Sequence, residues 1–409
     1  MSQLLHTAAR ALWRQAPAGA RQAVAHALMN RFKPRLASVG RDLLRDRGVP
    51  RIVIGFLSSP SGLGQSARLA ATSLRNDGYR VLGYDVGRYF HEVAGNIDHG
   101  IPPVGDGRGP AHVLLVIGAP YAAFALAALG RDFVKDKLIT GYWAWELPTV
   151  PRSWERGLPT VHEIAVPSLF TANAVARLGA GLPIRVCPHP VALDHPPLSP
   201  FATGAARPDQ PFTVVSTLSV GSGFERKNPL GLIRAFRLAF GDARDRRLRL
   251  LVTAAEHYAP ARTAILHAVG RARNIQVTWR PLTRPEFLQW WGTPDVYALL
   301  HRAEGFGLPL AEAMCAGLPV VATGWSGNMD YMTEQTSLPV RYRLVDVVDP
   351  QRKYAATEGQ WAEPDIEHAA ELLQTLAANP DLGREIGATA HRAMRVRLTG
   401  QNFCRNLLG

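Results

Sequence analysis

The sequence predicts an α/β protein built from two doubly wound domains that face each other across a cleft. Its 409 residues exceed one compact core and suit two domains of about 150–200 residues. From residue 51 onward, short apolar runs alternate with helical patterns, which is typical of parallel βαβ units. A proline-rich stretch over residues 189–211 divides this alternation into two series, and such stretches typically mark domain boundaries.

The first series begins with the apolar run 51–59, which has the composition of a buried parallel strand. A glycine loop follows, and the next apolar residues recur at helical spacing until a stop at Gly78. A second helix is expected over 171–180. Further strands are expected over residues 79–86, 111–118, 137–146, 162–168 and 184–190.

The second series repeats the same alternation after the proline-rich stretch. Strands are expected over residues 211–219, 248–254, 275–281, 295–300 and 318–324, and helices over 228–240, 261–272 and 310–317. The chain ends in an arginine-rich helical segment. We therefore divide the chain into an N-terminal segment and three further parts, with boundaries at residues 1–50, 51–200, 201–385 and 386–409.

Two features bear on the cellular compartment. Residues 113–130 carry no charge, but a strand, a turn at Pro120 and a helix explain them better than a membrane span does. Cys187, Cys315 and Cys404 are odd in number and lack metal-ligand spacing, which favours a reducing compartment. Since the first residues also lack the pattern of a signal peptide, we expect a cytoplasmic protein.

The formal net charge of +13 is concentrated near the N-terminus. Residues 1–50 contain nine Arg and Lys against two Asp, or +7, and apolar residues recur there at helical spacing. Such a basic amphipathic segment suits peripheral contact with an anionic membrane surface, on the inner face of the cell membrane. A solvated helix packed on a domain edge explains the pattern equally well. No motif for nucleic-acid binding accompanies the charge.

The most specific motif spans residues 301–331. Glu304 follows a predicted strand, and Glu312 lies in the first turns of a predicted helix. Seven residues separate the two glutamates. Glycines at the start of a helix let backbone N–H groups approach an anion, and the helix dipole favours negative charge there. Two carboxylates in such a place would serve hydroxyl groups, because like charges repel phosphate.

Residues 304–323, EGFGLPLAEAMCAGLPVVAT, resemble the signature of the family 4 retaining glycosyltransferases (group 1 glycosyltransferases) of the bacterial polysaccharide type. The likeness includes residues 224–236, FERKNPLGLIRAF, and extends loosely over 51–409. It implies the GT-B fold, in which two Rossmann-like domains face each other. On this basis 51–200 binds the acceptor, 201–385 binds the nucleotide sugar, and the C-terminal helix crosses back to the first domain.

The resemblance also implies roles for individual residues. Glu304 would contact the donor sugar and Glu312 the ribose hydroxyls of the nucleotide, while the backbone of Phe306, Gly307 and Leu308 would lie near the sugar and diphosphate.

Arg226 and Lys227 follow the first predicted strand of the second series. An ammonium and a guanidinium there could neutralise the diphosphate as charge develops in the transition state. The family places an Arg/Lys pair on the donor phosphates with a wider spacing, so Lys227 is the closer match. A solvated basic loop is the alternative.

Gly62 and Gly64 fit G-x-G-x-x-A between a strand and a helix, with Asp85 about twenty residues later. This is a dinucleotide-binding pattern, so an NAD(P)-dependent oxidoreductase is the main alternative function. However, the glycines come late after the strand, and a dehydrogenase leaves residues 301–331 unexplained. The glycosyltransferase family also carries a glycine loop here, facing the donor phosphate.

Two further segments contain candidate site residues. Glu146 stands where many family members place a histidine on the donor sugar, so it is a candidate catalytic residue, with His162 and His189 as weaker candidates. Trp143 and Trp145 precede it and could stack on a sugar, although tryptophans in strands more often fill the core. After the last predicted strand, Ser326, Gly327 and Asn328 either donate to the diphosphate or form an ordinary turn.

These features predict an enzyme that moves a hexose from a nucleotide-diphosphate sugar with retention of configuration. The sequence contains no Asp-x-Asp motif, so we expect no metal or other cofactor. GDP-mannose is the first expectation for the donor and UDP-glucose the second. The expected acceptor is a lipid-linked or oligosaccharide hydroxyl in surface polysaccharide assembly. A catalytically inactive binding protein is disfavoured because Glu304, Glu312 and Lys227 are all present.

Overall fold

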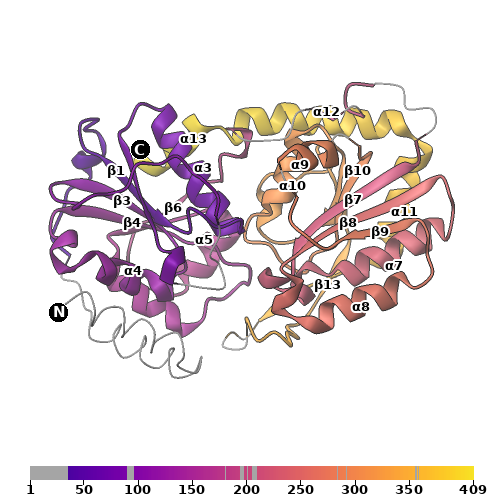
Figure 1. The fold of residues 1–409 in the computed structure, drawn as a ribbon, viewed down its shortest axis with the longest axis horizontal. Helices are drawn as coiled ribbons and strands as arrows, with labels where there is room; N and C mark the ends of the chain where they lie inside the picture. The colour runs from indigo at the N-terminus through magenta and orange to yellow at the C-terminus, as the bar shows by residue number, and fades with distance from the viewer. Residues whose placement is uncertain are drawn as a thin grey trace.

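The computed structural model shows two α/β domains side by side, with the C-terminal helices spanning both (Figure 1). The predicted basic segment 1–50 lies largely outside the described residues, since description starts at residue 36. The structure describes residues 36–89, 96–179, 181–193, 198–199, 201–204, 210–282, 284–291, 293–354, 357 and 359–409.

The first domain is a six-stranded, wholly parallel sheet with the order β2-β1-β3-β4-β5-β6. The four central strands are short and fully buried, as expected for a sheet covered on both faces, whereas the two edge strands are only partly buried. The strands are β1 (Arg51–Gly55), β2 (Val81–Asp85), β3 (Ala111–Val116), β4 (Lys137–Tyr142), β5 (Glu163–Val166) and β6 (Ile184–Val186).

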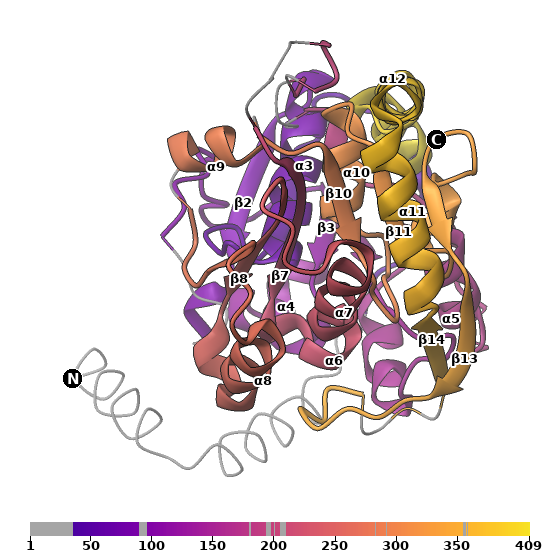
Figure 2. The same cartoon turned by 90° about the vertical axis from the view of Figure 1, so that its right-hand side faces the viewer.

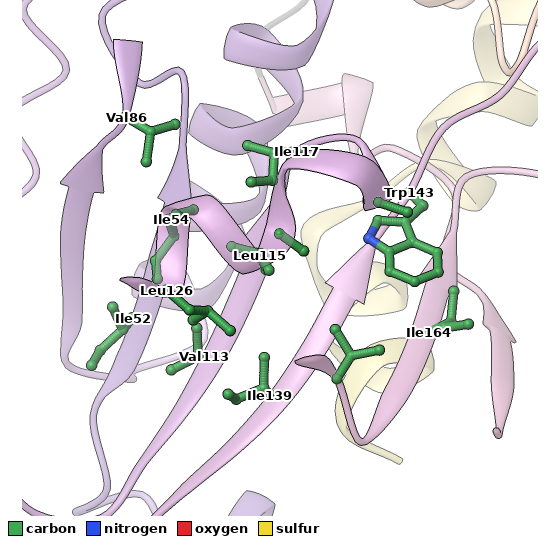
Figure 3. Packing of buried hydrophobic residues seen from close by; sticks show 14 of the residues in the cluster. Ile52, Ile54, Val86, Val113, Leu115, Ile117, Leu126, Ile139, Trp143 and Ile164 are labelled. Atoms are coloured by element: carbon green, nitrogen blue, oxygen red, sulfur yellow. The ribbon is translucent and has the colours of Figure 1, made fainter. Parts of the chain in front are cut away.

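Alternate side chains of these strands form two cores. One face carries Ile54, Leu115 and Trp143, which pack together under α4 (Ala122–Leu129) and α5 (Leu169–Ala176) (Figure 3). Trp143 is fully buried, so it belongs to the core rather than to a sugar-stacking surface. The opposite face packs against α3 (Gly62–Asn76).

The second domain is also a six-stranded parallel sheet, with the order β12-β11-β10-β7-β8-β9. Its strands are β7 (Phe212–Ser219), β8 (Arg246–Thr253), β9 (Ile275–Thr278), β10 (Val296–Leu299), β11 (Val320–Thr323) and β12 (Leu338–Val340). A short antiparallel pair, β13 (Tyr342–Asp346) and β14 (Gln360–Pro364), follows β12 and was not predicted from the sequence.

Helices cover both faces of the second sheet (Figure 2). One face packs against α7 (Pro229–Phe240) and α11 (Ile366–Ala378), and the other against α10 (Leu308–Cys315). The remaining helices are α6 (Phe224–Lys227), α8 (Ala259–Val269) and α9 (Arg284–Trp291). The predicted α/β class with two facing parallel-sheet domains is therefore confirmed.

The last two helices connect the domains. The long helix α12 (Pro380–Arg397) packs on α10 and runs toward the first domain (Figure 1). After a break at Leu398, the side chain of Thr399 caps α13 (Gly400–Leu408) by accepting a hydrogen bond from the Asn402 N–H. Phe403 and Leu407 of α13 lie in the first-domain core beside α3.

The uncharged stretch 113–130 forms most of β3, a turn through Pro120 and α4. None of the helices in the described part of the chain is long and apolar enough to cross a membrane. Cys187, Cys315 and Cys404 are buried and free.

The contact between α12 and the second domain depends on a glycine. A Cβ added to Gly387 would lie 2.1 Å from the carbonyl oxygen of Gly317. Alanine normally favours a helix by about 0.5–1 kcal/mol over glycine. We expect Gly387→Ala to do the opposite and destabilise the protein by about 2 kcal/mol, because the helix must shift away from α10. Chemical denaturation tests this, with Glu385→Ala on the exposed side of α12 as the control. Unchanged or raised stability contradicts the close packing.

Candidate active site

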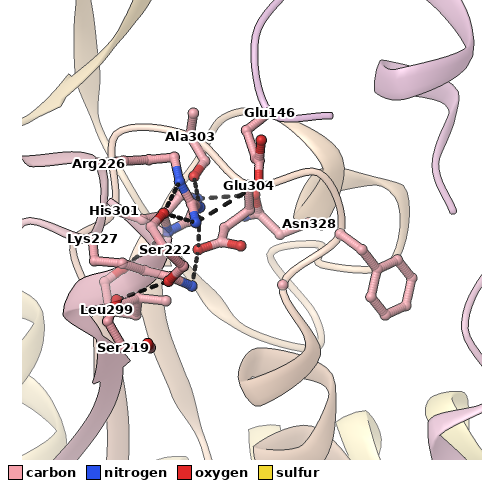
Figure 4. Close-up of polar contacts among 12 residues, drawn as sticks. Glu146, Ser219, Ser222, Arg226, Lys227, Leu299, His301, Ala303, Glu304 and Asn328 are labelled. Atoms are coloured by element: carbon pink, nitrogen blue, oxygen red, sulfur yellow. Dashed lines mark hydrogen bonds and ion pairs between the residues drawn. The ribbon is translucent and has the colours of Figure 1, made fainter. Parts of the chain in front are cut away.

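The candidate site lies at the carboxyl end of β10, where the loop to α10 carries Glu304 (Figure 4). Gly307 precedes the first residue of α10 and has φ of +90°. A Cβ there would lie 2.9 Å from Leu310 Cδ1 and 3.0 Å from the Tyr331 hydroxyl. The sharp turn from strand to helix therefore requires a glycine, and it places Glu304 just before a helix N-terminus.

Two cations hold the Glu304 carboxylate. Lys227 Nζ lies 2.5 Å from Glu304 Oε1, and Arg226 Nη1 lies 3.0 Å from the same oxygen. The Glu304, Lys227 and Arg226 side chains are 8, 9 and 3% exposed, so this is a buried cluster. A buried carboxylate without partners would be costly, and the two cations offset that cost.

The local sequence explains how both cations reach one carboxylate. Arg226 and Lys227 end α6, a single helical turn. Asn228 then adopts the left-handed conformation, φ 48° and ψ 53°, and its side chain caps α7 by accepting a hydrogen bond from the Gly231 N–H. Asn228 Nδ2 also donates to the Leu300 carbonyl at 2.9 Å, which ties this turn to the end of β10. The RKNP sequence thereby fixes the cations beside Glu304.

Electrostatics keep Glu304 ionised. Burial alone raises the pKa of the Glu304 carboxyl, but Lys227 and Arg226 outweigh burial and lower the pKa to about 2. Glu304 is therefore a weak base and a stable anion at neutral pH. This suits a group that accepts hydrogen bonds from sugar hydroxyls.

Arg226 also fixes the surrounding backbone. Its guanidinium donates to the Ala303 carbonyl at 2.7 Å and to the Ser222 carbonyl at 2.8 Å. Its Nη2 lies 3.8 Å from Oε1 of Glu146, which belongs to the first domain. The structure thus brings together four predicted catalytic residues from both domains: Glu304, Lys227, Arg226 and Glu146.

The two domains touch directly beside this cluster. The Ser168 hydroxyl at the start of α5 donates to the Gly305 carbonyl at 2.6 Å, and the Leu169 N–H donates to Asp330 Oδ2 at 2.6 Å. A Cβ on Gly305 would lie 2.8 Å from the Trp145 carbonyl oxygen. Trp145 itself packs edge-on against Tyr354, with 5.5 Å between ring centroids. The described conformation is therefore closed at the site.

The predicted glycine loop lies at the start of α3. The Ser61 hydroxyl accepts a hydrogen bond from the Gly64 N–H, and a Cβ on Gly64 would lie 2.3 Å from the Ser59 carbonyl oxygen. Gly62 is the first residue of the helix. Asp85 accepts hydrogen bonds from the N–H groups of Ser58 and Gly87, so its carboxylate organises these loops.

The remaining predicted donor-binding residues lie on or near α10. Leu308 begins the helix and Glu312 lies one turn further, half-buried. The Phe306 ring packs edge-on against His189, with centroids 4.9 Å apart. His189 also lies 3.0 Å from the Tyr142 hydroxyl, and burial lowers its pKa to about 3. His189 is thus a neutral residue packed against the loop between β10 and α10.

Ser326, Gly327 and Asn328 lie against the backbone of Glu304 rather than forming a detached turn. The Glu304 N–H donates to Ser326 Oγ at 2.8 Å, and the Gly327 N–H donates to the Glu304 carbonyl at 2.9 Å. His301, which the sequence analysis did not single out, lies 3.0 Å from Asn328 Oδ1 through its Nε2. Its position three residues before Glu304 is the feature of the sequence that could have identified it as a site residue.

Within the described residues, no group of three or more His, Cys, Asp or Glu side chains is arranged to hold a metal ion. His162, a weaker candidate, lies away from the cluster: its ring accepts a hydrogen bond from the Ile139 N–H and contacts the Ala37 carbonyl.

Two facing parallel-sheet domains that meet beside a buried carboxylate and its paired cations are the arrangement expected of a GT-B glycosyltransferase. A family model described as family 4 glycosyltransferase in conflict systems matches residues 173–406, more than half of the chain. The chain therefore belongs to this family of transferases. This family match gives no support to the oxidoreductase alternative.

Solved structures support the fold. HepE from Anabaena, in complex with UDP, has a TM-score of 0.60 and 13% identity, covering 88% of this chain and 98% of its own. A glycosyltransferase from Rickettsia africae ESF-5 has a TM-score of 0.59 and 13% identity, with coverage of 88% and 97%. Sucrose-phosphate synthase from Thermosynechococcus elongatus has a TM-score of 0.58 and 14% identity, with the same coverage. No curated protein matches the sequence.

The buried cluster generates a prediction about stability. We expect Lys227→Met to lower the free energy of unfolding by about 3 kcal/mol, because Glu304 loses its closest cation. Adding Glu304→Gln should recover part of that loss, which a double-mutant cycle in chemical denaturation measures.

Lys135→Met is the matched control. Lys135 pairs with Asp132 at the same distance of 2.5 Å, but both side chains are exposed. Its effect on stability should be much smaller than that of Lys227→Met, because solvent screens an exposed ion pair. Equal effects of the two lysine substitutions contradict the role given to burial.

Proposed function

We propose that this glycosyltransferase moves a hexose from a nucleotide-diphosphate sugar to a saccharide or lipid-linked hydroxyl, with retention of configuration. The observation that carries the proposal is the buried Glu304 carboxylate, held by Lys227 and Arg226 where the two domains meet. Glu304 would orient the sugar through its hydroxyls. Glu312, one turn along α10, would bind the ribose hydroxyls.

The diphosphate would lie between Lys227 and the N-terminus of α10. The first backbone hydrogen bonds of this helix are those that the Leu310 and Ala311 N–H groups donate to the Gly307 carbonyl. The N–H of Leu308 comes before these donors in the chain. Such N–H groups and the helix dipole favour an anion. Lys227 would then exchange part of its contact with Glu304 for the leaving phosphate, as negative charge develops there. The N-terminus of α3, at Gly62 and Gly64, faces the same anion in this proposal.

Retention fits a front-face reaction better than a double displacement. Glu304 has a pKa near 2 and two cations on one oxygen, so it is a poor nucleophile. In a front-face reaction the leaving phosphate oxygen takes the proton of the acceptor hydroxyl. The C1–O bond to the diphosphate breaks as the C1–O bond to the acceptor forms, so no covalent enzyme intermediate is needed. Glu146 and Glu304 would stabilise the positively charged sugar ring.

Two nucleotide sugars are proposed as the donor. The motifs favour GDP-mannose first and UDP-glucose second. The likeness to HepE, which has been solved with UDP and with UDP-glucose, supports the uridine donor.

A cavity of about 570 Å³ in the first domain is a candidate acceptor site. It opens at the carboxyl ends of β1 and β2, where ligands of open α/β sheets bind. Ser59, Asp85 and His99 line it together with Tyr84. The Ile101 N–H donates to His99 Nδ1, so the proton of a neutral His99 lies on Nε2. A carboxylate, an imidazole N–H and hydroxyls suit a polyhydroxylated acceptor.

The biological setting is also a proposal. The sequence suggests surface polysaccharide assembly at the inner face of the membrane, whereas the family description names conflict systems. A saccharide or lipid-linked hydroxyl satisfies the chemistry in either setting. Independence from metals and other cofactors belongs to the same proposal, because Lys227, Arg226 and the helix N-terminus supply positive charge for the diphosphate.

Thermal-shift measurements in the presence of EDTA test the proposed donor. The full chain is screened against GDP, UDP, ADP, NAD and NADP. A ligand at 100 times its Kd adds about 2.7 kcal/mol of stability, which corresponds to a rise of about 3 °C in Tm for a chain of this length. We expect one nucleoside diphosphate to produce this rise without metal.

The rise should be smaller in Lys227→Met, measured against the Tm of that variant alone, and unchanged in Lys135→Met. Stabilisation only by NAD or NADP would contradict the proposal, and stabilisation only after adding Mg²⁺ or Mn²⁺ would contradict metal independence.

A further inference from the structure

A closed set of hydrogen bonds surrounds the backbone of Glu304. The set joins the end of β10 to the turn after β11, which includes the short 3₁₀ helix Gly327–Asp330. Ser326 accepts a hydrogen bond from the Glu304 N–H, and Gly327 donates one to the Glu304 carbonyl. Both backbone groups of the proposed sugar-binding residue are therefore held by this turn.

The Asn328 amide has a fixed direction within the set. Its Nδ2 donates to the Thr323 carbonyl at 3.0 Å, so its Oδ1 points the other way. That oxygen lies 3.0 Å from His301 Nε2 and 3.2 Å from Ser326 Oγ. Asn328 and His301 are both fully buried, so their side chains cannot exchange their hydrogen-bond partners for water.

The amide direction decides how the Ser326 hydroxyl is used. A hydroxyl has one proton, and Ser326 donates it to Asn328 Oδ1. Its lone pairs are therefore available to the Glu304 N–H. His301 Nε2 faces two oxygens that can only accept, Asn328 Oδ1 at 3.0 Å and the Trp325 carbonyl at 3.3 Å, so we assign its proton to Nε2 and this N–H stabilises the arrangement. If the amide turned over, its NH₂ group would face Ser326 Oγ and His301 Nε2, and the Ser326 proton would lose its acceptor in this set.

We propose that Ser326, Asn328 and His301 are positioning residues that hold the Glu304 carboxylate in place for the sugar. This rests on the proposed function of Glu304, and it gives the turn a different task from donating hydrogen bonds to the diphosphate. The packing agrees with it, because a Cβ on Gly327 would lie 2.2 Å from the Gly305 carbonyl oxygen. The turn is pressed against the Glu304 loop.

The backbone of Ser326 provides a clean test. Ser326 has φ of +81°, a region that glycine adopts readily and other residues rarely do. Ser326→Gly therefore removes the hydroxyl and relieves the backbone at the same time. If Ser326 were needed only for folding, its substitution would lower stability and activity together.

We expect Ser326→Gly to keep or raise the Tm and to lower kcat for the nucleotide sugar at least tenfold. The Kd of the bare nucleoside diphosphate, GDP or UDP, should stay within twofold, since the sugar contact alone is disturbed. His301→Leu should lower kcat at least tenfold, whereas His301→Gln, which restores an N–H donor, should recover at least a third of the wild-type rate. Arg395→Ala, on the exposed side of α12, is the neutral control.

Two outcomes of the activity and binding measurements overturn the proposal. The first is an unchanged kcat in Ser326→Gly. The second is a tenfold weaker Kd for the nucleoside diphosphate, which would assign the turn to the phosphates.

Amide hydrogen exchange gives a readout that needs no activity. The peptide containing the Glu304 amide should exchange at least tenfold faster in Ser326→Gly than in wild type, while peptides of β7 and β8 stay protected. Unchanged protection also overturns the proposal. A wild-type enzyme that neither binds nor turns over nucleotide sugars would refute the proposed function, and the exchange result would still decide on the positioning set.

Discussion

A carboxylate buried at the end of a central strand must be neutralised, and this requirement organises the second domain. Glu304 meets it through Lys227 and Arg226, which come from the end of α6, 77 and 78 residues earlier in the chain. The left-handed turn at Asn228 makes this possible, because it ends α6 and starts α7 directly beside β10. Buried ion pairs seldom add net stability over an apolar core. Ion pairs at a helix N-terminus between two domains therefore indicate a role in binding or catalysis more than a contribution to folding stability.

The same place determines how the domains meet. Gly305, next to Glu304, leaves room for the Trp145 backbone and accepts the Ser168 hydroxyl, so the first domain rests on the loop that carries the acid. Glu146 arrives with it and faces Arg226. In the first domain, α13 takes part in the core, so the chain's last helix ties the two halves together. The same contacts thus close the site and arrange its charges, which fits an enzyme that has to exclude water from an activated sugar.

Much of this could be predicted from the sequence, since strong local patterns determine it. The short apolar runs and the EGFGLPLAEAM motif predicted the fold class and the position of Glu304. The RKNP segment predicted two cationic side chains for the site. The antiparallel pair β13–β14 was missed because Tyr342–Asp346 is mostly exposed and polar, without the apolar run of a buried strand. The pairing of Arg226 with Ala303 and Glu146 could not be predicted, because it depends on contacts between segments that are distant in the sequence. The same holds for His301, whose partner Asn328 lies 27 residues away.

The most direct test of the central claim is the steady-state kinetics of Glu304→Gln with the nucleotide sugar identified by ligand screening. Glutamine keeps the shape and a hydrogen-bond acceptor but removes the charge that balances Lys227 and Arg226. The account predicts a kcat at least 100-fold lower, equivalent to about 2.7 kcal/mol of transition-state stabilisation. It also predicts a Kd for the bare nucleoside diphosphate that is unchanged or tighter, because Lys227 is released toward the phosphates. Wild-type turnover in Glu304→Gln would contradict the account.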